Sequence, residues 1–356
     1  MPTISIDTFF ACSLMIIVVL SAMAGLSKVL STYMNTTVGG ENIDERYEEI
    51  SKYILLSEGK PLNWGQNGQI TPETFGLAEA DSENPYTLDL DKISRLNGDN
   101  IHAVSYGQIF TALKMSDVAF RLEIKPIFQV TINLTSTFEA VNETTYQFEI
   151  STEKNGVPVQ TWLKYYVIAE NYLETSTTYV SAGRTSLNVT LSNTVKGPAL
   201  LIVFARASIN AKMVSFNAQA FTHNSVEPES RGTFLRLSPL NYSLDVSFNY
   251  PNISLSNAYA LTFNCSSNLT QTASGNESAA YKIPHFLDES PTLIVVTGWN
   301  STDFFAEWTA YPQIPVEIGM DFSNALTISN VYNFDYLVTI NSVIYKCTVW
   351  LGGPKK

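Results

Sequence analysis

The residues that could do chemistry are few and scattered. The histidines His102, His223 and His285 stand alone, and the chain contains no His-x-x-x-His, Cys-x-x-Cys or Gly-x-Ser-x-Gly motif. Those spacings place zinc ligands or a serine nucleophile on one element. The sequence therefore predicts no catalytic residue, no metal site and no cofactor, and we expect a protein that is not an enzyme. A carboxylate pair assembled by folding, as in an exported glycan-active hydrolase, stays open as an alternative.

Acidic residues are concentrated near the N-terminal third. Asp81, Glu83, Asp89 and Asp91 offer oxygen ligands of the kind that calcium prefers, but they lack the spacing of a calcium-binding loop. We interpret them as part of a solvated acidic segment, because residues 41–91 hold most of the excess acids of a chain whose net charge is −12. This charge argues against nucleic acid as a partner.

Aromatic residues near the C-terminus have two interpretations. They form either a surface for a glycan or protein ligand or the core of a β-sandwich. The residues concerned are Trp299, Trp308, Trp350, Tyr311, Tyr332 and Tyr336.

Two of the three cysteines could pair if the compartment is oxidising. Cys265 and Cys347 each follow apolar residues at strand spacing, so both are expected to point into an apolar face. They form either a candidate disulfide or two separately buried thiols. Cys12 lies in the apolar N-terminal stretch, where we interpret it as a small hydrophobic side chain.

Asn-x-Ser/Thr sequons recur along the chain, and as a set they indicate a glycosylated exterior domain. The candidate N-glycosylation sites are Asn35, Asn133, Asn142, Asn188, Asn241, Asn252, Asn264, Asn268, Asn276 and Asn300.

An uncharged stretch near the N-terminus is the strongest indication of location. Phe9 to Leu26 is just long enough to cross a bilayer as a helix. The stretch fits a membrane anchor, a signal peptide cleaved after Ala24, or a buried core helix. We expect a single-pass cell-membrane protein with its C-terminal bulk outside the cell and the lipid bilayer as its partner. The residues of this membrane or assembly helix are Phe9, Phe10, Leu14, Ile16, Ile17, Val18, Val19, Leu20 and Leu26.

Beyond residue 34 the hydrophobic period changes along the chain. Apolar residues at helical spacing predict helices near residues 43–57 and 106–113, which with the loop between them make up an acidic, α-rich collar at residues 35–115. From residue 116 the period is two, and Asn155-Gly156 and Asn341-Ser342 mark hairpin turns. We expect a mainly β fold with two antiparallel immunoglobulin-like sandwiches, at residues 116–229 and 230–356. One larger sandwich with an insertion near residues 266–291 is the alternative.

The N-terminal third resembles the archaeal type IV pilin-like surface proteins. The resemblance rests on the following motifs: Ile6-Asp7-Thr8-Phe9-Phe10, Asn63-Trp64-Gly65, Phe75-Gly76-Leu77-Ala78, Tyr86-Thr87-Leu88-Asp89 with Lys92 and Arg95-Leu96, and a helix at Tyr106 leading to a strand at Phe120. It implies a helix that embeds in a membrane or packs in a filament core, with a β domain presented outside. Pilins of this kind are cut after a basic residue and glycine, and Met1 to Ser5 contain neither.

Asp7 has two interpretations. The resemblance implies the acid that neutralises a neighbouring subunit's terminal amine, whereas the residue type and position fit an N-cap that accepts from the first free amides of the helix.

Two functions remain from different classes. One is a non-enzymatic surface protein that displays sandwiches for adhesion, envelope contact or filament formation, with itself or pilus components as partners. The other is a membrane-tethered ligand-binding or sensory ectodomain.

Overall fold

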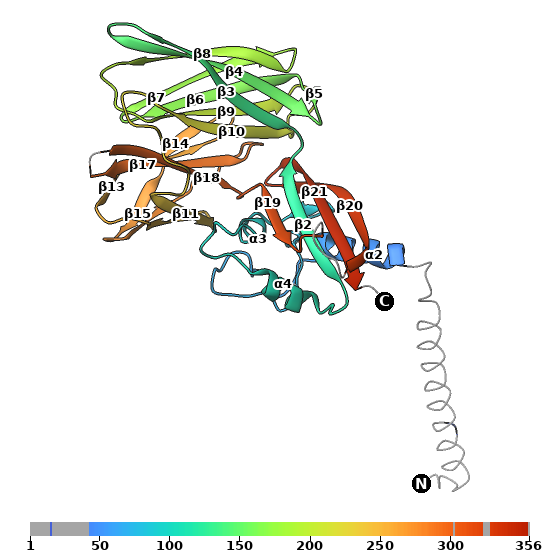
Figure 1. Ribbon diagram of the computed structural model, residues 1–356. Coiled ribbons are helices and arrows are strands. Elements are labelled where there is room, and N and C mark those ends of the chain that lie inside the picture. The colour runs from blue at the N-terminus through green and yellow to red at the C-terminus, as the bar shows by residue number, and fades with distance from the viewer. Residues whose placement is uncertain (1–14, 16–42, 302, 323–327, 355–356) are drawn as a thin grey trace, which may run out of the picture. The chain divides into compact units, whose positions relative to one another are not determined.

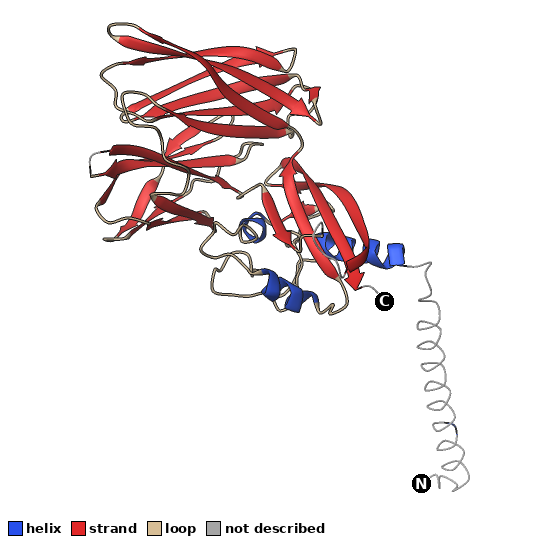
Figure 2. Cartoon of the chain, in the orientation of Figure 1, coloured by secondary structure: helices blue, strands red, loops and turns tan. Residues whose placement is uncertain are grey.

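The computed structural model describes residues 15, 43–301, 303–322 and 328–354. It is mainly β (Figure 2). The chain divides into two compact units, Met1–Ile50 and Ser51–Lys356. The expected N-terminal helix, with Asp7 and the sequon at Asn35, lies outside the described residues. Within the described ranges, no helix combines the length and the apolar character needed to cross a membrane.

The helices lie before the first long strand. They are α2 (Ile43–Leu56), α3 (Leu90–Ser94) and α4 (Tyr106–Leu113). The sequence predictions for α2 and α4 are confirmed. Ser105 caps α4, because its hydroxyl accepts from the backbone of Gln108 while the Gln108 side chain accepts from the backbone of Ser105. The short helix α3 was not predicted, and it is capped by Asp89.

One sheet joins strands from both ends of the β region. In spatial order, this terminal sheet contains β1 (Thr87–Leu88), β20 (Ile328–Ile340), β21 (Val343–Pro354), β2 (Ala119–Pro126) and β19 (Val316–Gly319). The hairpin β20–β21 turns at Asn341 and Ser342, whose φ angles are 46° and 66°. That turn is confirmed, since hairpins of this kind need positive φ at both central residues. Leu122 of β2 pairs with Val349 of β21, and both are buried.

Two further sheets face each other and form the first sandwich. The outer sheet contains β3 (Gln129–Glu139), β4 (Glu143–Lys154), β5 (Val157–Pro158) and β8 (Arg184–Ser192). The sheet opposite contains β10 (Val214–Phe221), β9 (Ala199–Ala207), β6 (Thr161–Ala169) and β7 (Tyr172–Val180). Phe148, Val167 and Leu201 are among the fully buried residues of the core between them.

The second sandwich is built in the same way. One sheet contains β11 (Leu235–Leu240), β12 (Ser243–Phe248), β16 (Ser278–Lys282) and β15 (Thr270–Ser274). The other contains β14 (Ser266–Asn268), β13 (Ile253–Leu261), β17 (Thr292–Asn300) and β18 (Asp303–Tyr311). Leu244, Ile294 and Phe305 belong to the core between these sheets.

The two sandwiches are fused by an apolar interface. Ile202 and Phe204 of β9 belong to the same buried cluster as Leu293 and Val295 of β17. The alternate residues of each strand belong to the core of its own sandwich, as Leu201 does in β9. Both faces of β9 and β17 are therefore buried, which explains why these strands read as nearly continuous apolar runs.

The strand pairing divides the β region differently from the expected boundaries at residues 115 and 229. β2 was placed in the first sandwich and the β20–β21 hairpin in the second, yet these strands pair with one another in the terminal sheet (Figure 1). The turn at Asn155-Gly156 is confirmed, but it returns into the short strand β5. The longer strand β6 pairs instead with β7 and β9 in the opposite sheet.

Candidate functional site

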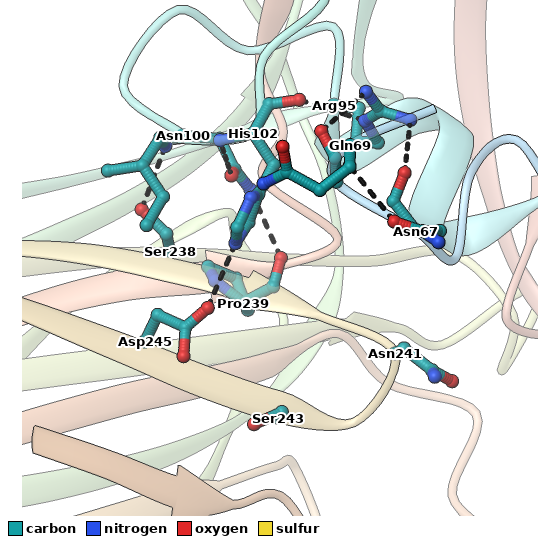
Figure 3. A network of polar contacts seen from close by, with 12 residues as sticks. Asn67, Gln69, Arg95, Asn100, His102, Ser238, Pro239, Asn241, Ser243 and Asp245 are labelled. Carbon is teal, nitrogen blue, oxygen red and sulfur yellow. Dashed lines mark hydrogen bonds and ion pairs between the residues drawn. The ribbon is translucent and has the colours of Figure 1, made fainter. Parts of the chain in front are cut away.

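A set of polar contacts lies where residues 91–102 of the collar meet the second sandwich. We call it the polar joint and define it by Asp91, Arg95, Asn100, His102, Asp245, Tyr311 and Gln313. Figure 3 shows part of it. Several of these residues stand in or beside the motifs that carry the pilin resemblance.

Arg95 organises the loops of the collar. Its side chain is buried, at 2% exposure. It donates hydrogen bonds to backbone oxygens: from Nε to His102 (2.8 Å), from Nη1 to Trp64, Asn67 (3.0 Å) and Ile70 (2.8 Å), and from Nη2 to Gly68 (3.3 Å). Burial lowers the pKa of Arg95, while the charge of Asp91 acts in the opposite direction. The guanidinium thus holds the loop at residues 64–70 against the segment that follows α3.

Lys92 has a similar structural role. It is fully buried, and its Nζ donates to the backbone oxygens of Glu58 (2.9 Å) and Ala78 (2.8 Å). Burial lowers its pKa. Gly65 lies directly against it, because a Cβ at that position would come within 2.8 Å of the Lys92 backbone nitrogen. The Trp64-Gly65 motif is therefore explained by packing.

Asp91 links α3 to the second sandwich. Its Oδ1 accepts from the Tyr311 hydroxyl at 2.7 Å and from the Asn241 backbone nitrogen at 2.8 Å. Burial raises the pKa of Asp91 to about 6, although both hydrogen bonds act to lower it. Burial and the neighbouring Asp91 charge also raise the pKa of Tyr311. Asp91 is therefore a titratable contact between two parts of the fold.

Asn100 and His102 complete the polar joint. The fully buried Asn100 donates from Nδ2 to the Gln313 Oε1 at 2.7 Å and to the Pro239 backbone oxygen at 3.1 Å. His102 Nε2 lies 2.9 Å from Asp245 Oδ2 on β12. Each of these side chains is engaged with another part of the chain. This arrangement can fasten the collar to the sandwich, and it presents no activated nucleophile.

The acidic residues at 81–91 and His223, which were considered in the sequence as possible ligands or catalytic groups, do not form one cluster. Asp81 and Glu83 are exposed, whereas Asp89 caps α3 and Asp91 is buried. His223 is buried, with its Nδ1 2.9 Å from the Tyr146 hydroxyl. Within the described ranges, no group of three or more His, Cys, Asp or Glu side chains is arranged to hold a metal ion.

The candidate disulfide between the two cysteines is not formed. Both Cys265 and Cys347 are free thiols. Cys347 is buried in β21 of the terminal sheet, as its spacing suggested. Cys265 is exposed instead, because it lies in the turn between β13 and β14 rather than within a strand. Cys347 therefore lies in the terminal sheet, whereas Cys265 lies in a turn of the second sandwich.

The sequons are accessible almost throughout the described residues. Asn300 is half-buried, and the remaining described sequon asparagines are exposed: Asn133, Asn142, Asn188, Asn241, Asn252, Asn264, Asn268 and Asn276. The Asn264 amide donates from Nδ2 to Asp288 Oδ1 at 2.7 Å, so this nitrogen is already engaged.

The C-terminal aromatics do not form one surface. Tyr311 is buried in the polar joint, and Trp350 lies beneath Arg121 on the terminal sheet, with the guanidinium carbon 5.2 Å from the ring centroid. Tyr336 stacks on Tyr86 at 5.4 Å between ring centroids. Trp308 of β18 is half-buried and borders a cavity.

Sequence reasoning missed the structural roles of Arg95, Asn100 and Gln313. The available sequence signal for Arg95 was its charge, directly after the short segment that Asp89 caps. Asn100 and Gln313 carried no local signal, because their contact joins residues far apart in sequence.

Comparisons with known proteins give little information on function. No protein-family model matches the chain, and no curated protein matches it. Among the solved structures that match is HBP35 of Porphyromonas gingivalis, at 13% sequence identity and a TM-score of 0.20. The match covers 51% of this chain and 63% of that chain, so this chain spans just under two thirds of that length. A TM-score this low supports no argument about fold or function.

Proposed function

We propose that this chain is a non-enzymatic surface protein whose N-terminal helix anchors or assembles it and whose immunoglobulin-like sandwiches are presented outside the cell. The observation that carries the proposal is the fusion of the two sandwiches through β9 and β17. Buried residues such as Phe204 and Val295 form an apolar interface between the sandwiches. Such an interface makes one rigid body from two sandwiches, which suits display or load-bearing.

The exposed sequons support the exterior location. Glycans need asparagines that stand in solvent, and Asn142, Asn252 and Asn276 lie in exposed turns. The archaeal pilin-like character and the role of Asp7 remain proposals that rest on the sequence resemblance.

Open strand edges on the first sandwich support assembly with another copy or with pilus components. β7 pairs with β6 in unbroken register, and its outer edge has no paired strand among the described residues. β8 is likewise the outermost strand of its sheet. On the opposite side of the sandwich, β10 and β3 are the edge strands of the two sheets. The Asn217 side chain of β10 donates to the Val130 backbone oxygen of β3 at 2.9 Å and so links these two edge strands. Long regular edges with few charges favour pairing with a further strand.

The first test is the intact mass and N-terminal sequence of the native protein recovered from cell membranes. A start at Met1 would support a retained anchor, and a start between Pro2 and Phe9 would support a processed pilin. A start at Gly25 would overturn the anchored-scaffold proposal.

A matched pair of variants separates anchoring from folding. Val18→Arg places a charge in the centre of the apolar stretch, which costs about 3 kcal/mol in membrane insertion. We expect this variant to lose membrane association, whereas Ser27→Arg, next to Lys28, should retain it. Equal membrane retention of both variants would contradict the anchor.

A further inference from the structure

A cavity of about 280 Å³ lies beside the polar joint. Its walls come from the collar loop at residues 98–99, from β11 with the loop that precedes it, and from β18. We call this cavity the arginine pocket and define it by Asp99, Arg231, Arg236, Asn249, Glu307 and Trp308.

The walls of the arginine pocket are held in place before any ligand arrives. The Glu307 carboxylate, on a residue only 3% exposed, accepts from the backbone nitrogens of Gly232 at 2.6 Å and Phe234 at 2.9 Å. Asn249 Nδ2 donates to the Gly232 oxygen at 2.8 Å. The residues that follow Arg231 are therefore held both by Glu307 of β18 and by Asn249. A preformed site loses less conformational entropy on binding.

Two exposed guanidinium groups, those of Arg231 and Arg236, line the pocket. Arg231 Nη2 lies 3.1 Å from Asp99 Oδ2, in a pair whose side chains are 47% and 68% exposed. Arg236 donates to the backbone oxygens of Asp99 at 2.8 Å and Gly98 at 3.0 Å. Among the described residues, no carboxylate forms an ion pair with Arg236. The pocket contains two carboxylates and two guanidinium groups, but Glu307 is buried and accepts from backbone N–H groups, so Asp99 is the exposed acid of the pocket.

We propose that the arginine pocket binds one acidic sugar unit, a pyranose ring that carries a carboxylate. Guanidinium groups match carboxylates through paired N–H donors. Trp308 offers an apolar surface to the ring, and Asn249 and Asp99 offer polar groups to its hydroxyls. The volume is slightly below the range of drug-sized ligand sites, which fits a single ring. This recognition goes beyond the scaffold role and does not depend on how the chain is anchored.

Calorimetric titration of the full chain in detergent micelles tests the proposal with three probes: D-glucuronate, D-glucose and acetate. Glucuronate should bind saturably and at least about ten-fold more tightly than either other probe, because only it has both the ring and the carboxylate. Arg231→Gln should weaken glucuronate binding about ten-fold or more. The matched control Arg184→Gln, an exposed arginine on β8 that pairs with Glu153, should not change it.

A second variant should strengthen glucuronate binding, so its result cannot be explained by misfolding. Asp99→Asn removes the acid that competes for Arg231, so glucuronate affinity should rise several-fold. Absence of saturable glucuronate binding, equal binding of acetate, or unchanged affinity in both Arg231→Gln and Asp99→Asn would each overturn the proposal.

Discussion

Asp91 gives the sharpest prediction, because its titration links a buried contact to stability. In the folded chain its pKa is raised from 3.8 to about 6. The folded state therefore binds this proton more tightly than the unfolded chain does. The stability that the protonation of Asp91 contributes is complete below pH 3.8 and is lost as the pH rises through about 6. This rise in pKa corresponds to roughly 3 kcal/mol.

The variant Asp91→Asn removes the titration and keeps an oxygen that can accept from Tyr311 and Asn241. Urea unfolding of the wild type and the variant should be followed by tryptophan fluorescence at intervals from pH 4 to pH 7. The difference between their free energies of unfolding should shift by roughly 2–3 kcal/mol across this range, in favour of the variant at pH 7. Using this difference removes the contributions of other titrating groups that the two proteins share.

Glu83→Gln is the matched control, because this carboxylate is exposed. It should leave the pH dependence of the free energy of unfolding close to that of the wild type. A difference between wild type and Asp91→Asn that stays within about 0.5 kcal/mol from pH 4 to pH 7 would refute the reasoning, since Asp91 would then titrate alike in the folded and unfolded chains.

Three further predictions concern packing and thiols. Phe204→Ala, at the interface between the sandwiches, should lower the free energy of unfolding by about 3–5 kcal/mol. The control Ile209→Ala, at a residue that is 83% exposed, should change it by less than about 0.5 kcal/mol. Equal effects of the two variants in urea unfolding would contradict the interface. Gly65→Ala should destabilise the fold, because the added Cβ meets backbone within 2.8 Å, and an unchanged melting temperature would contradict this packing. A maleimide should label Cys265 in the native protein and Cys347 only after unfolding, as read by peptide mass spectrometry; native labelling of both, or of neither, would be inconsistent with their exposures.

Local features of the fold were predictable where one segment contains its own signal. The face of α2 was visible in the spacing of Tyr47, Ile50 and Ile54, and all three are buried. The turns at Asn155-Gly156 and Asn341-Ser342 were visible because Asn155, Gly156 and Asn341 are of residue types that adopt positive φ readily.

Pairing between distant segments was not predictable in the same way. The alternation of β2 fits any half-buried strand, so it does not specify whether the partner is the nearby β3 or the distant β21. The same applies to the collar, where the motif residues Lys92 and Arg95 gain their roles from carbonyl groups that only folding brings near. For Cys265, a shift of a few residues in the end of β13 changed the expected burial into exposure.

The terminal sheet also bears on how such a chain could have arisen. The chain leaves this sheet at the end of β2 and returns at the start of β19, and Ile124 and Val316 are paired neighbours at that point. Both sandwiches therefore occupy an insertion whose two ends lie side by side. Insertions with adjacent ends are the ones that a host domain tolerates best. Helices α3 and α4 and the terminal sheet can thus be regarded as a host module, into which evolution could place, exchange or enlarge the sandwiches.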